Sequence, residues 1–162
     1  MTTLSQEQLK EWFNYHSDGY LVWAVSRGKA KAGKKAGMIH KNGYLRTGIN
    51  GKVYSNHRLI YIWHYGKTSK FIDHIDGNPL NNKINNLREA NAIENQQNAK
   101  LSVKNTSGYK NVTLCPQTKK WAVKLRVDGK IKIVGRYNDI ELANLVAIEA
   151  RDKYHGKYAR NM

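Results

Sequence analysis

The residues best suited to chemistry lie between Phe71 and Lys100, in the segment FIDHIDGNPLNNKINNLREANAIENQQNAK. An Asp-His pair, Asp73 and His74, precedes an Asn-rich loop, and a helix start is predicted at Asn91. Histidine can act as a general base because its unperturbed pKa lies near neutrality. A hard cation such as Mg²⁺ prefers oxygen ligands, which carboxylates and amide oxygens supply. The segment therefore combines a candidate base with candidate metal ligands.

These residue types suit the hydrolysis of a phosphodiester, which needs a base for the water and a cation for the phosphorane and the leaving alkoxide. Asp-His pairs and Asn-rich loops are also common, because Asn tolerates turn conformations. The alternative for Asp73 and His74 is therefore a hydrogen-bonded pair at a strand end. Since adjacent strand residues point to opposite faces, the two can serve one site only if the strand bends or ends there. We predict that local distortion.

Composition narrows the class of protein. The chain has 162 residues, a formal net charge of +16 and 40% hydrophobic residues. This length allows one domain or two small ones, and the charge calls for a polyanion, with nucleic acid first and an anionic membrane second. No apolar run can span a bilayer, no signal pattern opens the chain, and the single Cys115 excludes an internal disulfide. We expect a soluble, cytoplasmic protein that is not secreted.

Before the candidate site, the sequence predicts a small lead-in rich in strands. Ser5 and Gln8 form a capping box, and Asn42-Gly43 and Asn50-Gly51 are hairpin turns. The segment 27–37 has five basic residues and three glycines, and we expect a mobile basic loop. The remaining predicted elements are a helix, three strands and a second helix, at residues 5–15, 20–25, 44–49, 52–55 and 58–65.

The site segment reads as strand, long loop, strand and helix, with strands at 71–75 and 87–90 and a helix capped by Asn91 and Glu94. A polar linker follows. In the last part of the chain, strands are predicted at 109–114, 121–127 and 131–134. A helix capped by Asn138 follows and ends at Gly156. In the middle strand, apolar residues alternate with Lys124 and Arg126. A bulge at Val134-Gly135 would reverse the alternation in the third strand.

The sequences FIDHIDGN, NNKINNLREA and IENQQNAK resemble the HNH endonuclease family, in the form found in phage and intron-encoded homing nucleases. The resemblance covers residues 57–100. It implies a ββα-metal unit, two short strands and a helix around one divalent ion. Mg²⁺ is the first candidate and Mn²⁺ the second. Zinc is not expected, because paired Cys ligands are missing.

The resemblance also implies roles for individual residues. His74 corresponds to the general base and Asp73 to the first metal ligand. Asn86 corresponds to the central Asn of the HNH motif. We count it among the catalytic residues because it would hold the loop and orient the histidine. Asn95 corresponds to the second metal ligand, and Asn98 is its neighbouring competitor. For His57, a structural role is favoured over a catalytic one.

The sequences SGYKNV, KKWAVKLRVDGK, VGRY and ANLVAIEARDKYHGKYARN resemble the APETALA-type (ethylene-response-factor) DNA-binding domain over about residues 107–162. That fold lays a three-stranded sheet into the major groove. Lys124 and Arg126 match its DNA-facing positions. Further candidates, mostly for phosphate contacts, are Lys110, Lys119, Lys130 and Lys132. A solvated sheet face is the alternative for all of them.

Together these observations predict an α+β protein in four parts: a basic lead-in (1–56), an HNH nuclease core (57–100), a linker (101–108) and a sheet-plus-helix DNA-binding domain (109–162). The predicted function is a metal-dependent, homing-type endonuclease that nicks or cleaves double-stranded DNA. The alternatives are a catalytically inactive sequence-specific DNA-binding protein and an RNA-binding protein. We expect no membrane and no protein partner, and a monomer or weak dimer. The resemblance implies a phage or mobile-element origin, which would place the protein in the host cytoplasm or nucleoid.

Overall fold

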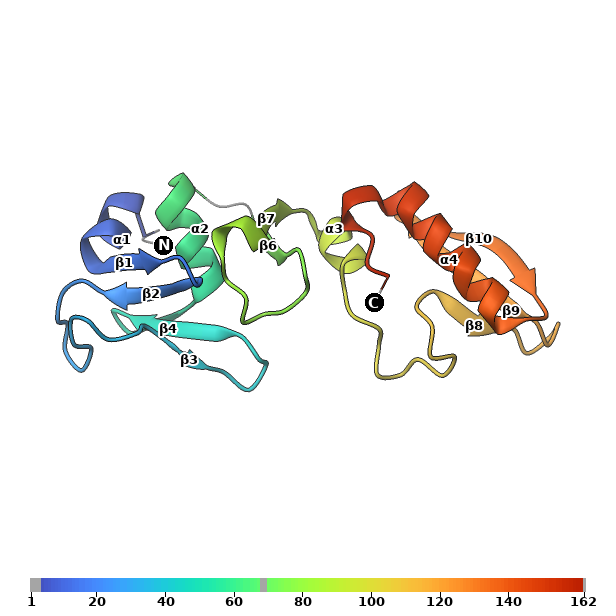
Figure 1. Cartoon of the computed structure of the whole chain (residues 1–162), viewed down its shortest axis with the longest axis horizontal. Coiled ribbons are helices and arrows are strands. Elements are labelled where there is room, and N and C mark those ends of the chain that lie inside the picture. Colours follow the sequence, from blue (N-terminus) through green and yellow to red (C-terminus); the bar gives the residue numbers. More distant parts are fainter. Residues whose placement is uncertain (1–3, 68–69, 162) are drawn as a thin grey trace. The chain divides into compact units, whose positions relative to one another are not determined.

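The computed structural model of the chain describes residues 4–67 and 70–161. Residue contacts divide the chain into two compact units, Met1–Asn91 and Ala92–Met162, and each is described by itself. The predicted α+β class is confirmed, because the described residues form small antiparallel sheets and four α-helices (Figure 1). No helix in this described part is long and apolar enough to cross a membrane.

The first helix is shorter than predicted. α1 (Gln6–Trp12) begins at the predicted capping box, in which Ser5 and Gln8 bond each other's backbone. It ends at Trp12 rather than at residue 15, because Phe13 takes extended backbone angles (φ −137°, ψ 140°). Phe13 instead opens β1 (Phe13–His16), which pairs antiparallel with β2 (Tyr20–Trp23). Strand pairing across the turn at Asp18-Gly19 therefore outweighs the helical spacing of Leu9, Trp12 and Phe13, from which the longer helix was predicted.

Part of the basic segment 27–37, for which we predicted a mobile loop, packs within the first unit. Ala36 is buried in the core, and its N–H donates to the Leu21 carbonyl at 2.8 Å. The guanidinium of Arg27 lies 3.9 Å from the centroid of the Trp12 ring. Basic side chains can pack in this way because their cations are attracted to aromatic faces and their stems are apolar.

The two predicted hairpin turns are confirmed, and they shape a three-stranded antiparallel sheet of β3 (Met38–Ile39), β4 (Leu45–Ile49) and β5 (Lys52–Ser55). Asn50 and Gly51 have φ values of 50° and 75°, which the tight turn between β4 and β5 requires. The second helix, α2 (Asn56–Tyr65), follows directly. It ends at Gly66, whose φ of 75° is the left-handed conformation typical of a helix end.

The candidate site lies on a two-stranded ribbon of β6 (Phe71–His74) and β7 (Leu87–Ala90), joined by a loop that ends in a short 3-10 helix. α3 (Ala92–Gln97) follows, so the predicted order of strand, loop, strand and helix is confirmed. By residue contacts, α3 belongs to the second unit. The functional boundaries at 57–100 stay a prediction.

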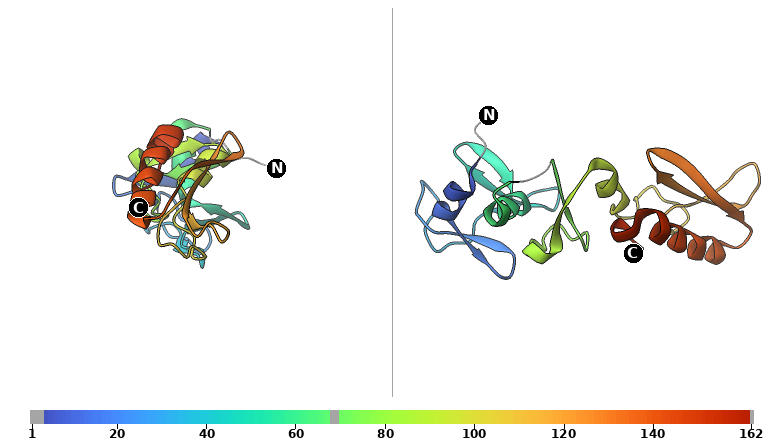
Figure 2. Two further views of the ribbon diagram at one scale, coloured as in Figure 1. Left: turned by 90° about the vertical axis from the view of Figure 1, so that its right-hand side faces the viewer. Right: turned by 90° about the horizontal axis from the view of Figure 1, so that it is seen from above.

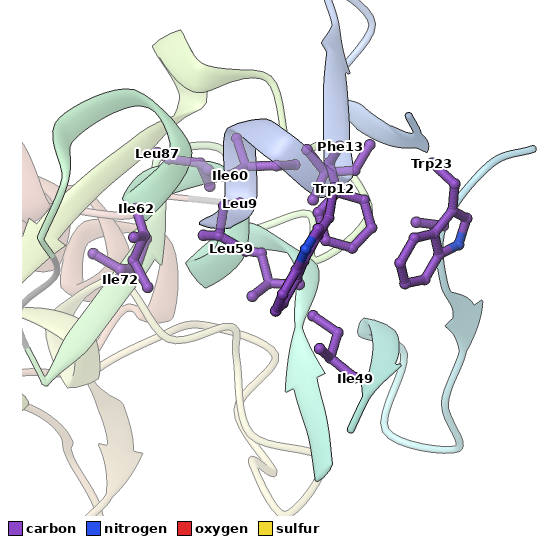
Figure 3. Close-up of a cluster of buried hydrophobic side chains, with 12 residues drawn as sticks. Leu9, Trp12, Phe13, Trp23, Ile49, Leu59, Ile60, Ile62, Ile72 and Leu87 are labelled. Carbon is purple, nitrogen blue, oxygen red and sulfur yellow. The ribbon is translucent and has the colours of Figure 1, made fainter. Parts of the chain in front are cut away.

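One hydrophobic core joins the lead-in to the ribbon. Figure 3 shows that side chains from α1, α2 and the two ribbon strands meet there. Each fully buried aliphatic or aromatic side chain contributes about 1.5–3 kcal/mol, so the lead-in is a large part of what stabilises the ribbon. Members of this core are Leu9, Trp12, Phe13, Leu21, Leu59, Ile60, Ile62, Ile72 and Leu87.

The second unit contains a three-stranded antiparallel sheet and one long helix, as predicted. Its strands are β8 (Val112–Leu114), β9 (Trp121–Val127) and β10 (Lys130–Tyr137), with β9 in the middle. The helix α4 (Ile140–His155) runs along one face of this sheet (Figure 2). The core between them is formed by Val112, Val123, Leu125, Ala143, Ala147 and Ala150.

Two boundaries in the second unit differ from the predictions. The cap of α4 is Asp139, whose carboxylate accepts the N–H of Leu142 at 2.6 Å, and not Asn138. β8 begins at Val112 rather than at Tyr109, because Asn111 has a φ of 69°, which breaks the extended backbone. The predicted end of the helix at Gly156 is confirmed.

Candidate active site

His74 is the last residue of β6, and its side chain is buried. Its Nε2 atom lies 2.8 Å from Oδ1 of Asn82. The amide nitrogen of Asn82 donates to the Leu80 carbonyl at 3.4 Å, which turns the amide oxygen toward the ring. His74 therefore carries its proton on Nε2, and in a neutral imidazole the other nitrogen, Nδ1, holds the lone pair. This is the form that a general base needs.

Two aromatic neighbours shield the His74 ring. The centroids of the His57 and Tyr44 rings lie 5.0 Å and 6.0 Å from its own. Burial and nearby positive charges lower the pKa of His57 to about 3. Burial also lowers the pKa of His74, although the hydrogen bond with Asn82 acts in the opposite direction. Both imidazoles are therefore uncharged at neutral pH, and His57 serves as packing for His74.

Asp73 forms an ion pair across the ribbon. Its Oδ2 accepts hydrogen bonds from Nε (3.0 Å) and Nη2 (2.9 Å) of Arg88, which stands opposite it in the strand register. The pairing is regular through His74, which stands opposite Leu87, and β6 ends there. The His74 carbonyl accepts the N–H of Gly77 at 2.8 Å. The strand thus ends after the two residues and not between them, so the local distortion that we predicted is not seen in the strand pairing. The alternative, two hydrogen-bonded side chains at a strand end, fits this geometry, because Asp73 bonds Arg88 and His74 bonds Asn82.

Asn86 closes the loop that follows His74. Its Oδ1 accepts the N–H of Asp76 at 3.1 Å, and its Nδ2 donates to the Asp76 carboxylate (2.9 Å) and the Asn81 carbonyl (2.8 Å). These bonds match the loop-holding role that the sequence suggested. The residue that bonds the histidine is instead Asn82, whose Oδ1 accepts from Nε2 of His74, and the sequence reasoning missed it. Its one signal was its place in the Asn-rich loop.

Residues of the lead-in also support the loop between β6 and β7. The hydroxyl of Tyr15 accepts the N–H of Ile84 at 3.1 Å. Gly19, in the turn between β1 and β2, has a φ of 86°, and a Cβ there would overlap the backbone of Asn82 and Lys83. The absence of a side chain at Gly19 therefore allows the turn to support the segment that orients His74.

Gly19→Ala is expected to lower the free energy of unfolding. A left-handed φ costs about 1–2 kcal/mol for an alanine, and the overlap with the loop adds to this cost. Gly33→Ala is the matched control, because Gly33 has a similar φ of 77° but open space around its Cβ position. Thermal unfolding should show a larger loss for Gly19→Ala. Equal losses in the two variants would contradict the proposed support.

A basic cavity of about 670 Å³ lies beside the three-stranded sheet of the first unit. Arg27, Lys29 and Arg46 line it, and none of its lining residues is acidic. Arg27 is held by a hydrogen bond from its Nη2 to Oδ1 of Asn50 (3.1 Å). Within the described residues, Nε of Arg46 is buried and has no hydrogen-bond partner. Such a cavity suits an anion such as a backbone phosphate.

Arg46→Gln is expected to weaken binding to every DNA duplex by a similar factor. If Arg46 contacts one phosphate, the slope of log affinity against log salt concentration should fall by about 0.9. Fluorescence anisotropy with EDTA present measures this slope. Lys52→Gln is the control, because Lys52 is an exposed cation on β5 outside the cavity. A salt slope that changes no more than in this control would contradict the phosphate contact.

The predicted metal ligands fit a hard cation by their chemistry. Asp73 offers a carboxylate and Asn95 an amide oxygen, the ligand types that Mg²⁺ prefers. Across residues 4–67 and 70–161, no group of three or more His, Cys, Asp or Glu side chains could hold a metal ion. Asn95 is exposed on α3, in the second unit, and its place as a ligand stays a prediction. Its neighbouring competitor Asn98 is buried.

The second unit brings together only some of the predicted DNA contacts. Lys124 and Arg126 are exposed on the face of β9 that points away from α4, as predicted. Lys130 and Lys132 lie opposite Val127 and Leu125 in the register, so they share the α4 side of the sheet. The ammonium of Lys132 lies 4.4 Å from the Tyr154 ring centroid on α4. Lys130 and Lys132 therefore lie on the opposite face of the sheet from Lys124 and Arg126.

A bulge supplies a different cation to the outer face. The register of β10 shifts between Ile133 and Gly135, which confirms the predicted irregularity. Arg136 consequently stands opposite Ala122 on the outer side, and it is exposed. Sequence reasoning missed it because its side depends on the bulge. Lys110 instead ties down the end of α3, where its Nζ donates to the carbonyls of Gln97 and Ala99 at 2.7 Å each.

Comparisons with known proteins agree with the position of this site. Residues 54–97 match the family model described as HNH endonuclease. Protein 3.8 of Escherichia phage T7 is 37% identical over 92 residues, which cover 56% of this chain and 74% of that protein. A solved structure entitled "DNA binding and cleavage by the HNH homing endonuclease I-HmuI" aligns with a TM-score of 0.43 and 25% identity. That alignment covers 81% of this chain and 74% of the other.

Proposed function

Because the chain belongs to the HNH endonuclease family, we propose that it is a metal-dependent, homing-type endonuclease that hydrolyses duplex DNA with His74 as general base. The observation that carries the proposal is the state of His74. Its ring is buried, uncharged and held by Asn82, with Nδ1 as the proton acceptor. It lies inside the segment that matches the family.

In the proposed mechanism, His74 takes a proton at Nδ1 from the attacking water and becomes an imidazolium. Its Nε2–H then donates from a charged ring to Asn82, and such charge-assisted hydrogen bonds are stronger than neutral ones. Asn86 and the turn at Gly19 hold the loop, so the ring does not need to reorient during the reaction.

One divalent ion, Mg²⁺ first and Mn²⁺ second, is the proposed cofactor. When bound, it supplies positive charge for the scissile phosphate and the leaving oxygen. Asp73 is the proposed ligand of the first unit, and its carboxylate suits a hard cation. Asn95 remains the further ligand that the family resemblance implies.

The second unit is proposed to anchor the enzyme on double-stranded DNA, as an APETALA-type domain would. A three-stranded sheet covered on one face by a helix supports this assignment, and so do the exposed Lys124, Arg126 and Arg136 on the other face. β8, β9 and β10 contain no acidic residue, and the whole chain carries a net charge of +16. A two- or three-stranded ribbon of this kind fits the major groove.

One observation favours a second candidate, a catalytically inactive DNA-binding protein on the same scaffold. The Asp73 carboxylate is paired with Arg88, and a buried ion pair of this kind would persist for stability alone. In that case DNA binding would remain and no metal would be needed.

Nicking of a supercoiled plasmid tests the proposal. Wild-type protein is incubated with plasmid and Mg²⁺, Mn²⁺ or EDTA, and with DNA of the source genome in parallel. We expect metal-dependent conversion to open circles, because one site per chain cuts one strand at a time. Linear product would show that both strands are cut, either by a dimer or by a second binding event of the same chain. Tight binding without cleavage of either DNA would support the inactive scaffold instead.

A further inference from the structure

The outer face of the second unit's sheet carries isoleucines among its cations. In the β9–β10 register, Ile131 stands opposite Arg126, and Ile133 stands opposite Lys124. Directly opposite residues of an antiparallel pair share a face. Ile131 is 67% exposed and Ile133 is 47% exposed, so neither side chain belongs to the core with α4.

This arrangement differs from an ordinary half-buried sheet, in which the solvent face is polar. Two β-branched apolar side chains here alternate with two cations over one patch, which we define as Lys124, Arg126, Ile131 and Ile133. The two cations of this patch can bind hydrogen-bond acceptors or phosphates. The methyl groups of its two isoleucines can contact apolar groups of a ligand. A ligand that matches it must present negative charge and exposed methyl groups side by side.

Duplex DNA has this combination in its major groove, where thymine alone among the four bases displays a methyl group. We propose that Ile131 and Ile133 recognise thymine methyl groups, while Arg126 and Lys124 contact neighbouring guanine edges or phosphates. This inference rests on the proposed function and names the residues that determine its target preference. Ile131 and Ile133 are two residues apart, about 6.8 Å along a strand, which equals about two base-pair steps.

Charge and groove shape favour this occupant over others. The three strands carry no acidic side chain, so the face complements a polyanion rather than a basic or mixed protein surface. RNA has uracil, which lacks the methyl group, and an A-form duplex has a major groove too deep and narrow for side chains to read. The two isoleucines therefore discriminate in favour of DNA.

The test compares thymine with deoxyuridine, which differs only by the methyl group. The full chain is used with EDTA, and duplexes that it binds are first selected from a random-sequence pool. The selected duplex is then made with each thymine replaced in turn by deoxyuridine. We expect replacement at two positions, about two base pairs apart, to weaken binding about fourfold each, the loss for one buried methyl. This comparison needs no variant.

The double variant Ile131→Ala/Ile133→Ala should bind both duplexes with nearly equal affinity. Leu145→Ala is the control, because Leu145 is 59% exposed on α4, and this variant should keep the thymine preference. Equal binding of thymine and deoxyuridine duplexes by the wild type would overturn the inference while leaving the endonuclease proposal intact. Retained preference in the double variant would do the same. Absence of duplex binding, or preference for RNA, would overturn both.

Discussion

His74→Ala is expected to lower the rate of metal-dependent nicking by about 10²–10⁴-fold, the usual contribution of a general base. Affinity for DNA should change little, because the side chain is buried beneath its neighbours and is uncharged. Single-turnover nicking with saturating protein measures the chemical step, and anisotropy with EDTA measures binding. Added imidazole should restore part of the rate, because it can occupy the space left by the missing ring.

The matched control for this experiment is His57→Ala. His57 is also buried, its ring lies 5.0 Å from that of His74, and both histidines are uncharged at neutral pH. Removing it leaves a similar hole but no missing proton acceptor. We expect a smaller loss of rate and no rescue by imidazole. If the two variants lost the same activity and the same thermal stability, the role of His74 would be packing rather than catalysis.

The elements that the sequence predicted well depend on short-range signals. The turn at Asn50-Gly51 and the helix end at Gly66 follow from residues that adopt positive φ most readily. The alternation along β9 placed Lys124 and Arg126 on the exposed face, because a strand has only two sides. The bulge in β10 could be anticipated from its glycine, but its consequence for single residues could not.

Features that the sequence did not predict depend on contacts between distant segments. Asn82 reaches His74 because its loop rests on the turn at Gly19, more than sixty residues earlier in the chain. The basic segment 27–37 packs because Trp12 lies where Arg27 can stack. Lys132 points to α4 because of its register with β9, which a charge pattern alone does not contain. In these cases the local sequence identified residues of the right type, but it did not predict which distant residues they contact.

Asp73→Asn is expected to reduce metal-dependent cleavage by at least about 10²-fold. Loss of a residue that only supports a metal ligand typically costs 10–100-fold, and loss of the ligand itself should cost no less. The substitution keeps the size of the side chain but removes its charge. It also breaks the ion pair with Arg88, whose side chain is only 15% exposed. Stability should therefore fall too, and activity alone cannot separate the two roles.

Arg88→Gln separates them, because it breaks the same ion pair and keeps the carboxylate. Breaking a buried pair costs about 3–5 kcal/mol, so both variants should unfold at lower temperature than the wild type. If Asp73 binds a metal, Mg²⁺ or Mn²⁺ replaces the lost positive charge in Arg88→Gln. The metal should then raise the unfolding temperature of Arg88→Gln more than that of the wild type, and Asp73→Asn should not respond. Equal responses of the two variants to metal would assign Asp73 to the ion pair alone.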